Sequence, residues 1–187
     1  DVAVFAGEYA AHTEARENSM ESALAEAALL TGIEKNADVV KLASYAPLFN
    51  RIGHSQWKPD MIWFDDHEVY LTPNYYVQKL YANHVGDHTL QLNGQDETLR
   101  KEGIYVTASE TKEGKLILKA VNTTDDAFLL PVEGADGQPV AGAAKIWVLE
   151  TAGEKPAEKP EPSKVAECAL ELNGSIRLAP KSFTVLE

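Results

Sequence analysis

Several kinds of feature are scarce or missing in this sequence of 187 residues, and each absence narrows the class of protein. The single cysteine, Cys168, excludes an internal disulfide. No run of about eighteen apolar residues is present, so we expect no membrane span. Basic residues number 17 against 29 acidic ones, and the net charge of −12 would repel a phosphate backbone. We therefore do not expect nucleic acid as a partner.

Metal-ligand patterns are also missing. The nearest histidine pair, His84 and His88, has helical spacing but straddles Gly86, where a helix is expected to have ended. We therefore predict surface or loop histidines, and no metal or cofactor. Asp65 and Asp66 are adjacent, and neighbouring side chains usually point in different directions, so this pair predicts a loop cap rather than two carboxylates sharing a proton.

The chain opens on a short apolar segment that ends in a carboxylate. Val2, Val4 and Phe5 are strand formers, and their run without charge is typical of a strand buried on both faces. Glu8 follows, at the carboxyl end of the strand, where parallel sheets and barrels carry functional groups. From these residues alone, a solvated glutamate at a strand end is the simpler interpretation. Because a buried-type strand needs neighbours, we expect a fragment of a longer protein.

A helix and a second strand are predicted next. Asn18, with Glu21 three positions later, predicts a helix start, and apolar residues at three- and four-residue spacing continue to about Thr31. Glu26 is assigned to the opposite, polar face of this helix. Residues 39–43 are predicted to form a second buried strand. A strand, a helix and a strand in about forty-five residues form a βα unit with parallel strands.

The remainder divides into a loop, a helix and a region of short strands. Residues 44–72 have no clear period but many aromatic residues, which predicts a long structured loop, and residues 73–83 predict a second helix. Past Gly86 the pattern predicts an antiparallel β-sandwich, with 151–164 as a solvated proline-rich loop. The predicted strands are residues 89–92, 103–109, 115–121, 127–132, 145–149, 169–172 and 183–186.

Six motifs occur in a specific order and spacing along the chain. They are VFAGEYA (4–10), NSMESALAEA (18–27), DVVKLASYAPLF (38–49), QWKPD (56–60), TPNYYVQKL (72–80) and SFTVL (182–186). Taken together, they resemble the α-L-arabinofuranosidases of glycoside hydrolase family fifty-one. The resemblance is dense over roughly the first eighty-five residues and reappears at the end, and no single motif is as specific as the set.

The resemblance implies a fold class that is α/β plus all-β. Residues 1–85 would hold the last βα units of a truncated (β/α)₈ barrel, and residues 86–187 an antiparallel, jelly-roll-like β-sandwich. In that family the Glu of a Gly-Glu-Tyr motif at the seventh barrel strand is the nucleophile, which corresponds to Glu8 here. Tyr9 and Asn50 are weaker substrate-binding candidates beside it. The resemblance thus implies a catalytic role for Glu8, in place of the simpler interpretation as a solvated glutamate at a strand end.

A retaining glycosidase needs a second carboxyl group about 5 Å from the nucleophile. In the family this acid/base glutamate follows an asparagine on the fourth barrel strand, and no Asn-Glu pair occurs in the 187 residues. We therefore expect the fragment alone to be inactive. The resemblance implies that the full-length parent hydrolyses terminal non-reducing α-L-arabinofuranosyl residues from arabinan or arabinoxylan. Its partner would be an arabinose-containing polysaccharide or oligosaccharide, which favours a secreted or periplasmic location.

Two alternatives assign no catalysis to residues 86–187. The sandwich either binds carbohydrate by itself, or it buttresses the barrel or mediates oligomerisation of the parent. Its acidic composition and the lack of an obvious aromatic platform favour the buttressing role. A barrel that lacks its first six strands would leave open edges on the remaining strands, so we also expect the fragment to self-associate.

Overall fold

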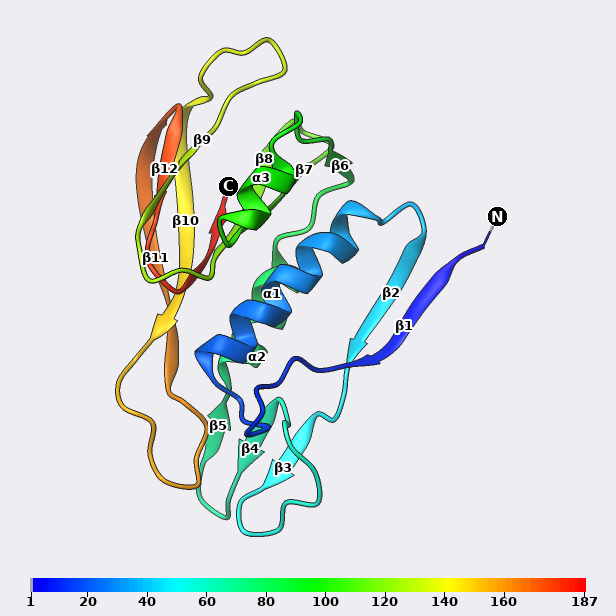
Figure 1. The fold of residues 1–187 in the computed structure, drawn as a ribbon, viewed down its shortest axis with the longest axis vertical. Coiled ribbons are helices and arrows are strands. Elements are labelled where there is room, and N and C mark those ends of the chain that lie inside the picture. Colours follow the sequence, from blue (N-terminus) through cyan, green and yellow to red (C-terminus); the bar gives the residue numbers. More distant parts are fainter. Residues whose placement is uncertain (1) are drawn as a thin grey trace.

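The computed structural model describes residues 2–187, which fold mostly as strands with few helices (Figure 1). The strands are β1 (Val4–Tyr9), β2 (Val40–Tyr45), β3 (Phe49–Arg51), β4 (Ile62–Phe64), β5 (Val69–Leu71), β6 (His88–Leu90), β7 (Ile104–Glu110), β8 (Leu116–Asn122), β9 (Phe128–Pro131), β10 (Ala141–Thr151), β11 (Ser163–Asn173), β12 (Ser175–Leu178) and β13 (Ser182–Leu186). The helices are α1 (Met20–Lys35), α2 (Pro73–Asn83) and α3 (Asp96–Lys101).

A six-stranded antiparallel sheet in the order β11-β10-β13-β8-β7-β6 forms the centre of the molecule. Side chains alternate between its faces, so Ile117 and Val121 of β8 face α1 and α2, whereas Leu118 and Ala120 face the β9-β12 ribbon. Both faces are therefore covered. The two helices and the sheet share one apolar core, in which the Phe183 ring stacks on Tyr81 with centroids 5.2 Å apart.

A buried ion pair joins α1 to this sheet. Lys119 of β8 is fully buried, and its ammonium group pairs with the Glu34 carboxylate in the last turn of α1. The same ammonium lies 4.9 Å from the centroid of the Tyr81 ring of α2. Burial lowers the pKa of Lys119, and the Glu34 carboxylate opposes this shift. Because an unpaired buried charge is costly, these contacts fix the position of α1 on the sheet.

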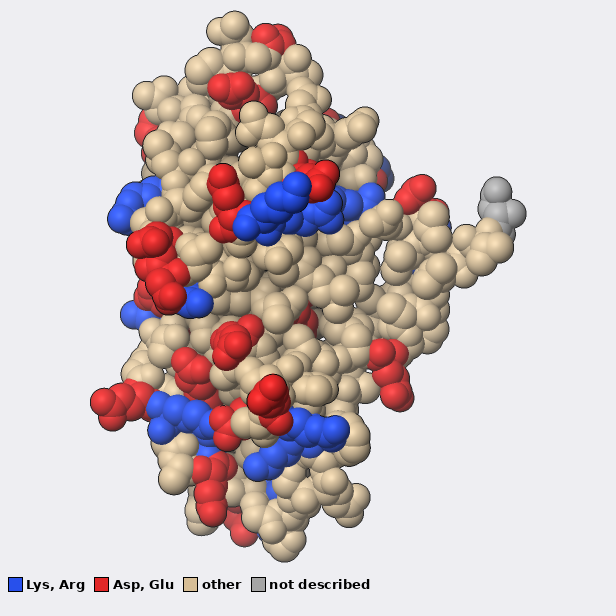
Figure 2. Space-filling model, viewed as in Figure 1, with Lys and Arg blue, Asp and Glu red and all other residues tan. Residues whose placement is uncertain are grey.

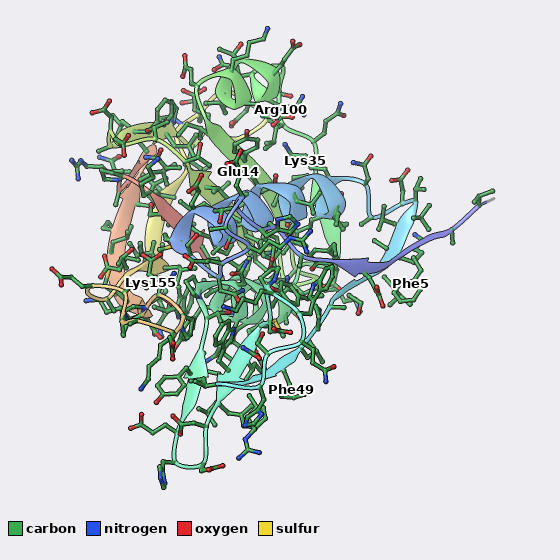
Figure 3. The ribbon with its side chains drawn as sticks, turned by 60° about the horizontal axis from the view of Figure 1, so that its bottom comes forward. Phe5, Glu14, Lys35, Phe49, Arg100 and Lys155 are labelled. Carbon is green, nitrogen blue, oxygen red and sulfur yellow. The ribbon has the colours of Figure 1, made fainter. Side chains whose placement is uncertain are left out.

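Strands β1 and β2 are parallel, as predicted, and begin and end slightly later than predicted. The prediction that they are buried is wrong, because Phe5 is 61% exposed and Leu42 is 64% exposed. These two strands form a separate ribbon at the side of the molecule, and within residues 2–187 no third strand extends it (Figure 1). Figure 3 shows Phe5 on this ribbon, away from the helices.

Helix α1 begins where predicted but is capped differently. Ser19, rather than Asn18, is the N-cap residue, and it exchanges hydrogen bonds with Ser22 in a capping box. The prediction that Glu26 lies on the polar face is wrong, because its side chain is fully buried. Asn18 is also buried, at 1% exposure. Both side chains belong to a polar cluster between α1 and α2.

The segment predicted as one long loop, residues 44–72, contains a three-stranded sheet in the order β3-β4-β5. Strands of three residues are too short to show a period in the sequence, which is why the prediction missed them. Asp65 caps the β4-β5 turn as predicted, accepting hydrogen bonds from the backbone N–H groups of His67 and Glu68 at 2.8 and 2.9 Å. Asp66 instead pairs with Arg51 at 2.6 Å.

The strand region follows the prediction with three differences. Strands β10 and β11 are each 11 residues long, more than twice the predicted length, and the predicted proline-rich loop connects them. Strand β12 and helix α3 were not predicted. His84 lies in the loop after α2, consistent with the prediction of surface or loop histidines, but it is not on the surface: it is 8% exposed, lies 2.7 Å from a Glu187 carboxylate oxygen and packs on Trp147.

Charged side chains are mixed over the surface rather than gathered by sign. Figure 2 shows basic groups beside acidic ones across one face, and the part that carries β1 and β2 is largely uncharged. Within residues 2–187 no helix is long and apolar enough to cross a membrane.

Candidate functional site

Glu8, the predicted nucleophile, lies next to the end of β1 and is exposed to solvent. Its strand carries one extra residue at this point, since Ala6 pairs with Ala43 and Tyr9 pairs with Tyr45. Such a bulge redirects side chains and is common beside active sites. Within residues 2–187 the Glu8 carboxylate makes no hydrogen bond or ion pair, so its oxygens are available to a ligand.

Tyr9 holds the end of β1 against α2. Its hydroxyl exchanges hydrogen bonds with the Gln78 side-chain amide at 2.8 and 3.1 Å. The ring packs edge-on against Tyr45 of the neighbouring strand, with centroids 6.2 Å apart. Burial raises the pKa of Tyr9. Tyr9, which follows Glu8 in the sequence, therefore connects the end of β1 to the polar cluster between the helices.

Glu26 lies at the centre of that cluster. Its two carboxylate oxygens accept hydrogen bonds from Gln78 at 2.7 Å and from Asn74 at 2.9 Å. Burial raises its pKa to about 7, although the two amides and the backbone at Ala11 favour the charged form. No cation pairs with it within residues 2–187, so the carboxyl group depends on neutral donors.

Glu26 should make folding stability depend on pH. Its pKa in the folded chain is raised to about 7 from the ordinary 4.5, so its contribution to stability is fully present below about pH 4.5 and is lost as pH rises through about 7. The shift corresponds to about 3 kcal/mol at most. We expect Glu26→Gln to remove this loss in denaturation curves between pH 5 and 8. Glu21→Gln, on the exposed face of α1, is the control, and parallel pH profiles for wild type and Glu26→Gln would contradict the assignment.

Asn18 connects this cluster to the segment after β2. Its amide nitrogen donates to the Tyr45 hydroxyl at 3.2 Å and to Asn74 at 3.0 Å. Its amide oxygen accepts from the backbone N–H of Asp60 at 3.1 Å and from the Trp63 indole at 3.2 Å. One buried side chain thereby joins the start of α1, the end of β2, β4 and α2.

Asn50, the third predicted site residue, lies on β3 and is 4% exposed. Its amide nitrogen finds no hydrogen-bond partner within residues 2–187. The residue borders a surface hollow together with Trp57 and Trp63. No hydrogen bond joins Glu8, Tyr9 and Asn50 to one another in this part of the chain, so the structure brings only Tyr9 into the polar cluster.

Sequence reasoning missed the cluster, although a signal for it was present. Ser22 and Glu26 are four residues apart on α1, Asn18 lies four positions before Ser22, just ahead of the N-cap, and Asn74 and Gln78 have the same spacing on α2. Because residues four apart lie on one face of a helix, two such rows of polar side chains that face each other can form hydrogen bonds between them. Asp60 was also missed; it is buried, and burial raises its pKa to about 6 against the opposing charge of Lys58.

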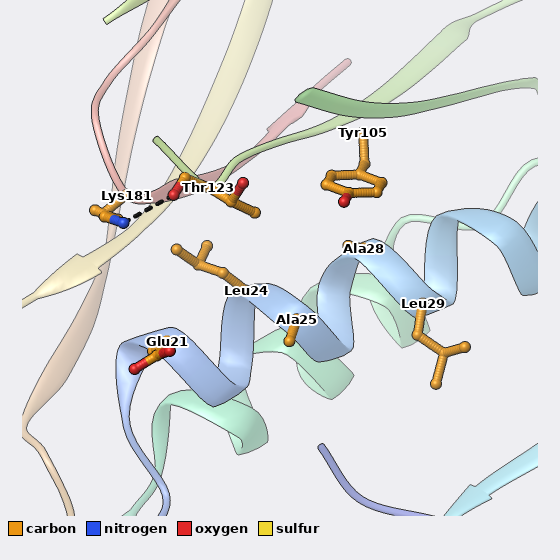
Figure 4. Close-up of a pocket in the computed structure, with 8 residues that line it drawn as sticks. All are labelled: Glu21, Leu24, Ala25, Ala28, Leu29, Tyr105, Thr123 and Lys181. Atoms are coloured by element: carbon orange, nitrogen blue, oxygen red, sulfur yellow. Dashed lines mark hydrogen bonds between the residues drawn. The ribbon is translucent and has the colours of Figure 1, made fainter. Parts of the chain in front are cut away.

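A second hollow, of about 520 Å³, runs along α1 and is bordered by none of the three predicted residues (Figure 4). Its wall includes Leu24, Ala28 and Leu29, and its lysine, Lys181, donates to the backbone oxygen of Thr123 at 2.9 Å. Among residues 2–187 there is no group of three or more His, Cys, Asp or Glu side chains that could hold a metal ion.

Solved structures that resemble this chain include glycoside hydrolases. A GH51 α-L-arabinofuranosidase with bound arabinose aligns with 98% of this chain at 27% identity and a TM-score of 0.79, and the alignment covers 32% of that structure. A GH51 α-L-arabinofuranosidase from Thermotoga petrophila shares the fold at a TM-score of 0.77 and 17% identity, with 98% of this chain and 42% of that one covered. The chain thus shares its fold with part of each of these two glycoside hydrolases.

The family follows from the sequence comparison. The family model described as the α-L-arabinofuranosidase C-terminal domain matches residues 6–186, and the chain belongs to this family. α-L-Arabinofuranosidase 1 of Arabidopsis thaliana is 35% identical over 194 residues, which cover 96% of this chain and 28% of that protein. α-L-Arabinofuranosidase A of Aspergillus niger is 40% identical over 162 residues, covering 82% and 26% respectively. The chain therefore spans little more than a quarter of these relatives.

Proposed function

We propose that the full-length parent of this chain is a retaining α-L-arabinofuranosidase, and that Glu8 is its nucleophile. The observation that carries the proposal is the exposed, unpaired Glu8 carboxylate at the bulged end of β1. The names of the relatives in the family support the substrate class. The substrates proposed are terminal, non-reducing α-L-arabinofuranosyl residues of arabinan or arabinoxylan.

The chemistry proceeds in two steps. A Glu8 oxygen attacks the anomeric carbon and forms an ester to the sugar, while a second carboxyl group gives its proton to the departing glycosidic oxygen. That second group, now a carboxylate, takes a proton from water, and the hydroxide oxygen displaces Glu8. Two inversions give net retention. We assign the second carboxyl group to a part of the parent outside this chain, so the chain alone should not turn over substrate.

Residues 1–85 are proposed to supply the last βα units of a (β/α)₈ barrel, and residues 86–187 a jelly-roll-like sandwich. The parallel β1-β2 pair, with α1 between the two strands in sequence, supports the first part. The shared core of α1, α2 and the six-stranded sheet supports a buttressing role for the sandwich. In this arrangement the sandwich holds the helices that position Tyr9 and, through it, the strand end that bears Glu8.

The proposed barrel implies that the chain, expressed by itself, self-associates through the β1-β2 ribbon. Phe5 and Leu42 expose most of their apolar surface there, and the strand edges have unpaired backbone groups. Light scattering should show oligomers at micromolar concentration, and the double variant Phe5→Ser/Leu42→Ser should shift the population toward monomer. Leu129→Ser is the control, because Leu129 is also 64% exposed but lies on β9. A wild-type chain that stays monomeric would contradict this expectation.

A further inference from the structure

We propose that the hollow bordered by Asn50 and Trp57, here called the tryptophan hollow, binds a sugar unit of the polysaccharide other than the unit that is cleaved. The hollow has a volume of about 650 Å³, within the range of about 300 to 1,000 Å³ of ligand sites. The identity of the sugar rests on the proposed function, whereas binding itself does not depend on Glu8.

Three separate segments form the walls of the tryptophan hollow. Arg16 comes from the connection after β1, Asn50 and Trp57 come from β3 and the turn that follows it, and Glu158 comes from the proline-rich loop. The first two segments follow the carboxyl ends of β1 and β2, the same ends of the parallel ribbon that carry Glu8. A glycan whose terminal unit reaches Glu8 can therefore extend toward this hollow.

An aromatic surface stands open at the hollow. Trp57 is 55% exposed, whereas Trp63 beside it is buried. The Arg16 guanidinium carbon lies 4.9 Å from the centroid of the Trp57 ring and holds the indole in place. An exposed, held indole has an apolar face and a polar edge, which suit the C–H face and the hydroxyl groups of a sugar ring.

Polar groups around this indole have unused bonding capacity. Arg16, Lys58 and Glu158 form no ion pair within residues 2–187, although the same chain pairs many of its other lysines, such as Lys155 with Glu17. The Asn50 amide nitrogen is buried without a partner, which costs about 1 to 3 kcal/mol unless an outside oxygen accepts from it. Sugar hydroxyl groups both donate and accept, so they match this mixed set.

The backbone at the hollow is held in uncommon conformations. Arg16 has φ of 52° and Glu158 has φ of 61°, and these are two of the three non-glycine residues with positive φ within residues 2–187. Left-handed backbone at ordinary residues persists where the surrounding structure demands it, often at ligand sites. Both residues lie on the same hollow. The hollow along α1, by contrast, is bordered by only one of the three residues with positive φ, Lys181.

The test is titration of a branched arabinoxylan oligosaccharide into the 187-residue chain, followed by the indole N–H signals of Trp57 and Trp63 in NMR spectra. We expect saturable shifts of both signals. In Trp57→Ala the affinity, followed at Trp63, should fall at least about tenfold, and in Phe49→Ala it should stay the same. Phe49 is the matched control because it is 65% exposed on β3 but does not border the hollow. No saturable shift in the wild-type chain, or equal affinity in Trp57→Ala, would overturn the proposal.

A kinetic arm separates this proposal from the assignment of Glu8. In the full-length parent, Trp57→Ala should lower kcat/KM for arabinoxylan about tenfold and leave kcat/KM for a small aryl α-L-arabinofuranoside unchanged, because the small substrate has no unit to place in the hollow. Equal losses on both substrates would overturn the subsite. Loss of the nucleophile assignment would leave the NMR result standing, so the two failures are distinguishable.

Discussion

Glu8→Gln in the full-length parent is expected to reduce kcat on an aryl α-L-arabinofuranoside by at least about 10³-fold, with KM changed little. Glutamine keeps the size of the side chain but has no carboxylate oxygen to attack the anomeric carbon. Because Glu8 is exposed and its carboxylate makes no hydrogen bond or ion pair within residues 2–187, the folded structure should tolerate the change. Unchanged denaturation curves would separate lost chemistry from lost folding.

The control for this experiment is Glu14→Gln, which changes an exposed glutamate in the connection that follows β1. Its kcat should match the wild-type value. Glu8→Ala with added azide gives a second readout, since a small anion in the vacated space can attack the anomeric carbon and yield a glycosyl azide of inverted configuration. A Glu8→Gln parent with wild-type activity would refute the nucleophile assignment.

Asn18→Ala is expected to lower the free energy of unfolding by about 3 kcal/mol. The change removes four hydrogen bonds and leaves the indole of Trp63 and the hydroxyl of Tyr45 without this partner in a buried site. Trp63 keeps one bond, to the backbone oxygen of Asp60 at 2.9 Å, which limits the loss. Chemical denaturation of the chain measures the effect.

Asn83→Ala is the matched control for this stability experiment. Its amide also donates one hydrogen bond, to the Lys79 backbone oxygen at 2.7 Å, but the side chain is exposed on α2. We expect less than about 0.5 kcal/mol there. If the two variants were equally stable, the polar cluster between the helices would not contribute to folding as described.

The sequence predicted those parts of the fold that have a strong local signal. The Ala-rich stripe of α1, the parallel β1-β2 pair and most strands past Gly86 follow from apolar spacing and turn residues alone. It failed where burial depends on distant segments. Phe5 and Leu42 look like core residues in the sequence, yet the described chain contains no element that covers them.

The candidate site likewise has residues with a local signal in the sequence and residues whose role depends on distant segments. Glu8 and Tyr9 were proposed as site residues because the resemblance marks a short motif, whereas Glu26 looks like a surface residue until α2 is placed against α1. Its partners Asn74 and Gln78 lie 48 and 52 residues further along the chain. Asn50 was named from the sequence, but its unpaired amide and the neighbouring Trp57 are visible only once β3 and the proline-rich loop are placed in space.

The most direct test of the central claim is to trap the covalent intermediate in the full-length parent. An activated 2-fluoro arabinofuranoside slows the second step more than the first, so the ester accumulates and peptide mass spectrometry locates it. We predict one sugar per active site, attached to the peptide that contains Glu8, and no labelling of the Glu8→Gln parent. A label on any other carboxylate, with Glu8 unmodified, would contradict the account.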